Sequence, residues 1–278
     1  MMPVVNQTVI KNFCLGLLLT PLLGSVSHAI IVRHDVQSTD YEIRGIDYPA
    51  VFFLEQQGSR KICVATVIHE RWALTAAHCT EETMVEETVS AGRRFGVMVG
   101  GKDREIDLVI KHPLYDQQSS TDVDLALLRF RTESNTPRPV SLQQEATELG
   151  EQVTLIGWGY FGLGTLGRQY DDGRLRRATN RISVANRYLR FEFDDPRNQL
   201  SESLPLEGMP SLGDSGGPAL IESELGAKLA GIAVGQIQGE NFQEETQGQY
   251  GATAVYERIS SHIDWIEEVV GAEVPFGS

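Results

Sequence analysis

Short apolar or alternating segments dominate the hydrophobic pattern of this chain. Several are rich in β-branched or aromatic residues, and turn-forming residues separate most of them. They span residues 50–55, 63–69, 95–99, 106–111, 125–130, 152–158, 175–184, 188–193, 219–222, 228–234 and 252–259. Because many short strands with few helical stretches are typical of antiparallel barrels and sandwiches, the pattern predicts an all-β protein.

Three further stretches do not read as strands. Ile259, Ile263, Ile266 and Val270 lie four, three and four residues apart, which predicts one amphipathic C-terminal helix with the serines after Ile259 as its caps. Residues 131–143 are polar, contain two prolines and show no periodicity. Residues 159–173 are rich in glycine, and we expect a flexible loop there.

Composition narrows the classes of protein and partner. A chain of 278 residues that is 41% hydrophobic and 22% charged is typical of a globular protein with one large or two small domains. Its formal charge of −14 argues against nucleic acid or an anionic membrane as a partner.

The first 29 residues are expected to be a secretory signal peptide. They contain no Asp, Glu or Arg, and an apolar run at 13–23 follows their one lysine. Small residues, Ser27 and Ala29, occupy the two positions that a signal peptidase reads. A membrane anchor is the alternative, but the run is short for a span. The sequence therefore predicts a secreted or periplasmic protein, without a membrane association once this segment is removed.

Two cysteines remain after that segment. Cys63 and Cys79 form an even pair in an oxidising compartment, which favours a disulfide. A pair of reduced thiols or of metal ligands is the alternative, but no neighbouring residues have zinc-site spacing. We therefore expect no metal at this pair.

Three separated motifs carry candidate chemistry. They are Thr-Ala-Ala-His-Cys at 75–79, Asp-Leu-Ala-Leu-Leu at 124–128 and Gly-Asp-Ser-Gly-Gly-Pro at 213–218. A serine hydroxyl becomes a nucleophile when a neutral imidazole takes its proton and a carboxylate fixes the imidazole tautomer. We assign Ser215 as nucleophile, His78 as general base and then acid, and Asp124 as the orienting carboxylate. Asp122 is a rival to Asp124, but it does not open the apolar run.

Together these motifs strongly resemble the chymotrypsin/trypsin-like serine peptidases, including the chain order His, Asp, Ser. The resemblance covers about residues 30–270. It implies two six-stranded antiparallel β-barrels with a C-terminal α-helix and the active site in the cleft between them. Residues 30–140 would form the barrel with His and Asp, and residues 141–278 the barrel with Ser and the helix. The implied activity is peptide-bond hydrolysis by a monomer, through an acyl-enzyme and without a cofactor.

The resemblance also assigns supporting residues. It implies the Cys63–Cys79 disulfide and an oxyanion hole made by the N–H groups of Gly213 and Ser215. It implies that Asp214 pairs with a free α-amino group. Since Ile30 and Ile31 follow Ala29 directly, removal of the signal peptide alone would expose either isoleucine as that N-terminus.

The specificity pocket departs from the family pattern. Its base, six residues before the nucleophile, is Met209, which cannot pair with Arg or Lys as the Asp of trypsin-like enzymes does. Ser211 stands where the family usually has a cysteine. One wall is Gln236 or Gly235, according to the alignment, and Ala254 falls on the opposite wall. A small or medium apolar residue before the scissile bond is expected.

Other departures leave rival interpretations open. The Ser that supports the catalytic carboxylate in the family is Ala233 or Val234 here, and residues 31–49 are longer than usual. The glutamates at 81, 82, 86 and 87 are interpreted as a solvated loop rather than a calcium site. A secreted binding protein that has lost catalysis, or an esterase on the same triad, remains an alternative function.

Overall fold

The computed structural model describes residues 30–116, 122–237, 243 and 246–271. The predicted signal peptide, residues 1–29, lies outside the described residues. Within the described part, no helix combines the length and apolar character that a membrane span needs.

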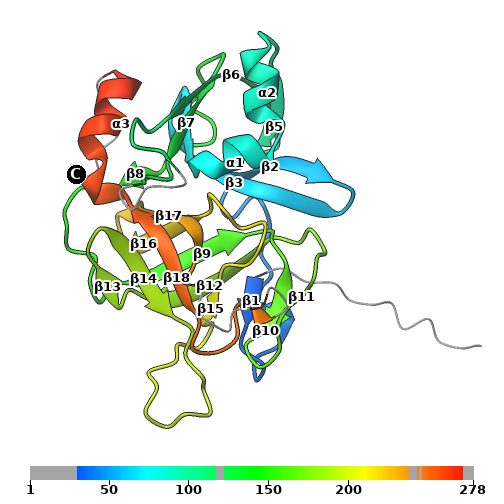
Figure 1. The fold of residues 1–278 in the computed structure, drawn as a ribbon, viewed down its shortest axis with the longest axis vertical. Coiled ribbons are helices and arrows are strands. Elements are labelled where there is room, and N and C mark those ends of the chain that lie inside the picture. Colours follow the sequence, from blue (N-terminus) through cyan, green and yellow to red (C-terminus); the bar gives the residue numbers. More distant parts are fainter. Residues whose placement is uncertain (1–29, 117–121, 238–242, 244–245, 272–278) are drawn as a thin grey trace, which may run out of the picture.

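The first half of the chain forms a six-stranded antiparallel sheet (Figure 1). Its edge strands β2 and β5 contact each other, so the sheet curls into a barrel. Two short helices, α1 (Ala77–Glu82) and α2 (Val85–Ser90), connect β4 to β5 along the chain. In spatial order the strands are β2 (Val51–Gln57), β3 (Arg60–His69), β4 (Trp72–Thr75), β7 (Ala126–Phe130), β6 (Lys102–Lys111) and β5 (Phe95–Val99).

The second half forms a larger curled sheet, and a short strand, β8 (Ser141–Leu142), adds to it in parallel with β17. The other neighbours pair antiparallel. In spatial order they are β12 (Arg176–Arg181), β9 (Gln152–Gly157), β16 (Pro218–Ser223), β17 (Gly226–Gln236), β18 (Thr253–Arg258), β14 (Tyr188–Glu192) and β13 (Val184–Ala185). Two curled sheets with few helices confirm the predicted fold class.

A small third sheet brings the start of the described chain onto this second half. Strand β1 (Ile30–Val32) lies between β10 (Phe161–Leu163), in parallel, and β15 (Gly208–Met209), antiparallel. Strand β11 (Gly167–Tyr170) pairs with β10, and the turn η1 (Ser38–Tyr41) follows β1. The first residues of the range predicted for the N-terminal barrel therefore pair with strands from the C-terminal range.

The glycine-rich stretch at 159–173 is not a flexible loop, contrary to the prediction. It contains the β10–β11 hairpin, and its glycines permit close packing: a Cβ on Gly162 would lie 2.0 Å from the carbonyl oxygen of Gly167. Strand β4 was also missed, because four residues are too few for a clear alternating pattern.

The C-terminal helix is present but begins later than the apolar stripe suggests. A 3₁₀ turn, η3 (Ile259–Ser261), precedes α3 (Ile263–Val270). The N-cap is His262 rather than a serine, and the hydroxyl of Ser260 instead donates to Glu148. Ile259 and Ile266 are buried in an apolar cluster that contains residues of both halves, so the end of the chain packs against the body of the molecule.

Candidate active site

Strand pairing brings two of the predicted residues together. Thr75 at the end of β4 pairs with Ala126 at the start of β7, so the residues just beyond those ends meet. His78 lies in α1 and Asp124 lies just before β7. The main-chain N–H of His78 donates to Asp124 Oδ1 at 2.8 Å, and His78 Nδ1 lies 2.5 Å from Asp124 Oδ2. These two contacts fix the imidazole plane and leave Nε2 for other chemistry.

Ser215 comes from the other sheet, in the turn before β16. Its carbonyl oxygen accepts a 2.7 Å hydrogen bond from the N–H of Val64 on β3, which ties this turn to the first barrel. Ser215, His78 and Asp124 line one cavity of about 490 Å³. The three predicted residues therefore meet at a single site between the two sheets.

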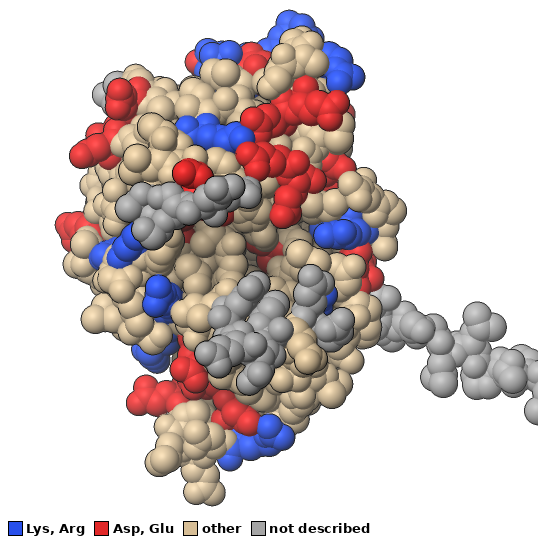
Figure 2. All heavy atoms as spheres, viewed as in Figure 1, with Lys and Arg blue, Asp and Glu red and all other residues tan. Residues whose placement is uncertain are grey.

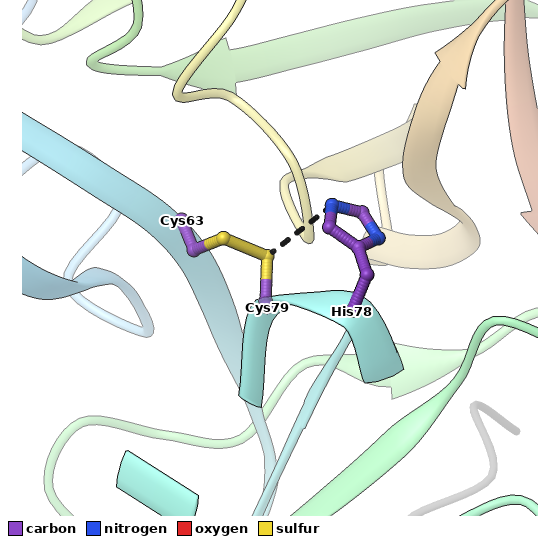
Figure 3. Close-up of side chains that lie close together, drawn as sticks. All are labelled: Cys63, His78 and Cys79. Carbon is purple, nitrogen blue, oxygen red and sulfur yellow. Dashed lines mark hydrogen bonds between the residues drawn. A yellow bond between two sulfur atoms is a disulfide. The ribbon is translucent and has the colours of Figure 1, made fainter. Parts of the chain in front are cut away.

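The disulfide lies beside the imidazole (Figure 3). Cys63 on β3 and Cys79 on α1 are bonded, which confirms the predicted bridge. The Sγ atom of Cys79 is 3.8 Å from Nε2 of His78. Because both sulfur atoms are in the disulfide, neither is a thiolate, and this close group of Cys63, His78 and Cys79 has lost its soft metal ligands.

Glycines shape the turn that carries Ser215. Gly213 and Gly216 have φ angles of +99° and +77°, a region that other residues rarely adopt. A Cβ on Gly216 would also lie 2.2 Å from the carbonyl oxygen of Val64. Among the backbone hydrogen bonds of the described residues, the N–H groups of Gly213 and Ser215 have no acceptor. Both donors are therefore available to a bound group.

These features agree with the comparisons with known proteins. A family model described as Trypsin matches residues 36–266. The chain is 27% identical to human kallikrein-8, over 78% of this chain and 80% of that protein, and 28% identical to trypsin 5G1 of Aedes aegypti, over 83% and 84%. It is 30% identical to mouse vitamin K-dependent protein C over 81% of this chain, but spans only 50% of that protein.

The chain belongs to the trypsin family. It is a serine-type endopeptidase, and such proteases act on polypeptides. A solved structure of neuropsin, a serine protease expressed in the limbic system of mouse brain, has the same fold with a TM-score of 0.61. It is 21% identical and covers 83% of this chain and 98% of its own.

The buried carboxyl of Asp214 is a second titratable group of this trypsin-family site. Its Oδ1 accepts from the N–H of Gly159 at 2.6 Å, and its Oδ2 accepts from the N–H of Ser211 at 2.9 Å. Burial nevertheless raises the pKa of Asp214 to about 7, since desolvation disfavours the carboxylate more than these donors favour it. A Cβ on Gly157 would lie 1.9 Å from Asp214 Oδ1, so the Gly-Trp-Gly motif makes room for this side chain.

Strand β1 is firmly held against the second half. Ile30 and Ile31 are fully buried, and Ile31 pairs with Met209. The N–H of His34 donates to the hydroxyl of Tyr250 at 3.1 Å. The hydroxyl of Tyr41 donates to the carbonyl of Glu207 at 3.0 Å, which holds the longer 31–49 segment against the second half.

The predicted pocket residues lie in different places. Gln236 lines the cavity, and its Oε1 accepts from the N–H of Gly248 at 3.1 Å. Gly235 also lines the cavity. Ala254, which pairs with Gln236 across the sheet, is fully buried. Met209 is buried in the core with Ile31 and is not part of the cavity wall.

The electrostatics around His78 favour its charged form. Burial disfavours the imidazolium, but the hydrogen bond and charge of Asp124 outweigh it, with smaller contributions from Glu82 and Glu81, so the pKa of His78 is raised. Glu82 itself lines the cavity. Figure 2 shows Asp and Glu side chains gathered beside the cavity, over α1 and α2.

The sequence analysis missed one residue of this site. Glu257 on β18 is buried, and its Oε1 accepts a 2.9 Å hydrogen bond from the main-chain N–H of Asp124. The available signal was a carboxylate inside the apolar strand at 252–259, although its partner lies 133 residues away in the chain.

Proposed function

We propose that the chain is a secreted or periplasmic endopeptidase, working as a monomer, in which Ser215 is the nucleophile. The observation that carries the proposal is the shared cavity, which is lined by Ser215 and by a His78 whose ring is fixed by Asp124. A single chain supplies all three groups, which fits a monomer. The signal-like composition of residues 1–29 supports export.

The proposed reaction has two halves. Ser215 Oγ attacks the scissile carbonyl carbon while its proton passes to Nε2 of His78, and the N–H groups of Gly213 and Ser215 stabilise the oxyanion. The imidazolium then gives that proton to the leaving amine as the peptide C–N bond breaks. Water attacks the resulting ester by the same route, and the carboxylic acid product leaves with Ser215 restored.

We also propose that cleavage after Ala29 makes Ile30, rather than Ile31, the mature N-terminus. Ile30 is the first residue of β1, is buried, and lies in the same sheet as β10, which begins two residues after Gly159. Its new ammonium would lie near Asp214 and favour the ionised carboxyl that burial now opposes. N-terminal sequencing of the secreted protein tests this, and a start well beyond Val32 would refute it.

The proposed specificity is for a small or medium apolar residue before the scissile bond. Gln236 lines the cavity and accepts from the N–H of Gly248, and its amide carries no charge for a basic side chain. A peptide panel that varies only this residue among Ala, Val, Leu, Phe, Lys and Arg tests the proposal. Preference for Lys or Arg would contradict it.

Labelling with a fluorophosphonate probe tests the proposed nucleophile. Mature wild-type protein is expected to be labelled, and Ser215→Ala is not. Absence of labelling in folded protein that begins at Ile30 would instead favour the binding-protein alternative. A matched amide and ester substrate pair, assayed on the same preparation, separates a peptidase from an esterase.

A further inference from the structure

A buried carboxylate stands directly behind the proposed catalytic acid. The side chain of Glu257 is 1% exposed, and its Oε1 accepts the N–H of Asp124 at 2.9 Å. The carboxylate of Asp124 itself faces the other way, toward the main-chain N–H and ring of His78. Asp124 is thus held from two sides, by His78 at its carboxylate and by Glu257 at its main chain.

The second oxygen of Glu257 faces a histidine. Oε2 lies 3.5 Å from Nε2 of His262, and it makes no hydrogen bond with any described residue. The ring of His262 packs edge-on against His112 at 5.1 Å, and His112 packs on Trp265 at 4.7 Å. The ring of His262 therefore lies against Oε2 of Glu257, and His112 and Trp265 pack behind that ring.

The neighbouring ring of His112 acts as an acceptor and a packing surface. Nδ1 of His112 accepts the N–H of Leu114 at 3.2 Å, which requires that nitrogen to be unprotonated. Burial, together with the neighbouring His262, lowers the pKa of His112 to about 4. His112 is therefore neutral near neutral pH, and its ring serves as a packing surface.

The strand neighbours of Glu257 are a phenol, an aliphatic side chain and an arginine that pairs elsewhere, and Arg187 lies 4.8 Å from the centre of the Tyr188 ring. Tyr188 on β14 pairs with it across the sheet, and Ile232 pairs with it on β17. The negative charges of Glu257, Asp122 and Asp124 contribute to the raised pKa of Tyr188, after the larger effect of burial. The next residue, Arg258, is engaged with Glu148.

A carboxylate in this position is costly unless it performs a task. Burying a polar group costs free energy unless it is hydrogen-bonded, and an apolar side chain would suit a buried strand better. A task is available, because Ala233 and Val234 provide no hydroxyl for the Asp124 carboxylate. The hydrogen bond from the Asp124 N–H to Glu257 Oε1 positions Asp124 by another route, through its main chain.

We propose that Glu257 is a positioning residue for the reaction, holding the main chain of Asp124 so that its carboxylate stays aligned with His78. The ring of His262 lies against Oε2 of Glu257 and keeps the Glu257 side chain in place. The inference rests on the proposed role of Asp124. It assigns Glu257 no contact with substrate, and the required property is an acceptor at Oε1.

Two variants separate positioning from packing. Glu257→Gln retains an oxygen acceptor of the same length, whereas Glu257→Met fills similar space with only a weak acceptor. For Glu257→Met, kcat is expected to fall roughly 10- to 100-fold with KM nearly unchanged, as for a small misalignment of catalytic groups. Glu257→Gln is expected to remain within about threefold of wild type, since its neutral acceptor is somewhat weaker. Equal kcat values in all three proteins would overturn the proposal, as would equal losses in both folded variants.

A spectroscopic readout reports the alignment itself. The proton between His78 Nδ1 and Asp124 gives a low-field proton NMR signal, which is expected to persist in Glu257→Gln and to shift or broaden in Glu257→Met. If Glu257→Met does not fold, exchange of the Asp124 amide proton in the wild type decides. Slow exchange and a kcat retained by Glu257→Gln support the proposal, whereas exchange within minutes overturns it.

Two controls keep this test apart from that of the proposed function. Wild-type protein must label with the fluorophosphonate probe and Ser215→Ala must not, and failure there refutes the catalytic assignment instead. Melting temperatures of the variants show whether a loss of kcat reflects unfolding.

Discussion

The two halves of the site hold their functional groups by different means. In the first barrel, side chains fix the functional groups. The carboxylate of Asp124 contacts both the main chain and the ring of His78, and a disulfide joins α1 to β3. In the second half, main-chain conformation fixes the site. The glycines around Ser215 have positive φ angles, and the buried carboxyl of Asp214 accepts main-chain N–H groups. Side-chain fixation tolerates changes in the surrounding backbone, whereas main-chain fixation depends on the whole turn being correctly seated.

The largest effect is expected from Asp124→Asn, which attacks the side-chain half directly. Asp124 accepts two donors from His78, and an amide presents one acceptor and one donor group. The imidazole would then be held in the wrong tautomer, and kcat is expected to fall about 10⁴-fold. Steady-state kinetics on a peptide substrate measures this.

A matched control for that variant is Asp122→Asn, two residues away in the same segment. Asp122 also lines the cavity but makes no contact with His78 among the described residues. Its kcat is expected to stay within about threefold of wild type, because the imidazole keeps its partner. A loss as large as that of Asp124→Asn would show that the acid has been wrongly assigned.

A smaller but still large effect is expected from Asp214→Asn, which attacks the main-chain half. Both oxygens of Asp214 accept main-chain N–H groups, so a carboxamide would turn its own donor toward Gly159 or Ser211. The turn that presents the Gly213 N–H would shift, and losing one oxyanion donor costs roughly 10²–10³ in kcat. Rates of fluorophosphonate labelling and peptide cleavage measure the loss.

Asp195→Asn serves as the control for Asp214→Asn, since it makes the same change at a half-buried position of the second half that pairs with Arg197. Unchanged labelling in Asp214→Asn would contradict the role given to main-chain geometry. An equal loss in the control would indicate a general effect of charge instead.

The same contrast explains what the sequence could predict. Side chains with their own motifs were predictable: Ser215 and Asp124 follow from local sequence, and the Cys63–Cys79 bridge from an even pair. Features that depend on main-chain packing were not, such as the hairpin in the glycine-rich stretch or β1 between β10 and β15. Glycine permits both close packing and flexibility, and the sequence pattern alone does not distinguish them.

Met209 and Glu257 both show the limit of prediction from local sequence: one was assigned to the site but lies in the core, and the other was not assigned but contacts Asp124. Resemblance placed Met209 at the base of a pocket, whereas its side chain packs in the core against β1, a segment far away in the sequence. Glu257 looked like one charged residue in an apolar strand, and only tertiary structure brings it to Asp124. Local sequence patterns do not identify contacts between residues that are far apart in the chain, so the roles of such residues can be assigned only from the folded structure.

The smallest expected effect concerns the charges around the first half. The pKa of His78 is lowered by burial but raised overall by Asp124, with Glu82 and Glu81 contributing in the same direction. The base must be neutral to accept the Ser215 proton, so activity is lost as pH falls through the pKa of His78. Glu82→Gln removes one negative charge and therefore lowers that pKa, which moves the acid limb of kcat/KM toward lower pH. Well above that limb, kcat/KM is expected to stay within about twofold of wild type, because Glu82 takes no part in the chemistry.

Glu224→Gln, an exposed change in the β16–β17 turn, is expected to leave the limb in place. The shift in Glu82→Gln is also expected to shrink at high ionic strength, since Glu82 is exposed and screened. An acid limb that stays in place in Glu82→Gln at low salt would contradict the contribution of Glu82 to the pKa of His78. The pKa and the orientation of the imidazole would then both depend on its direct contact with Asp124.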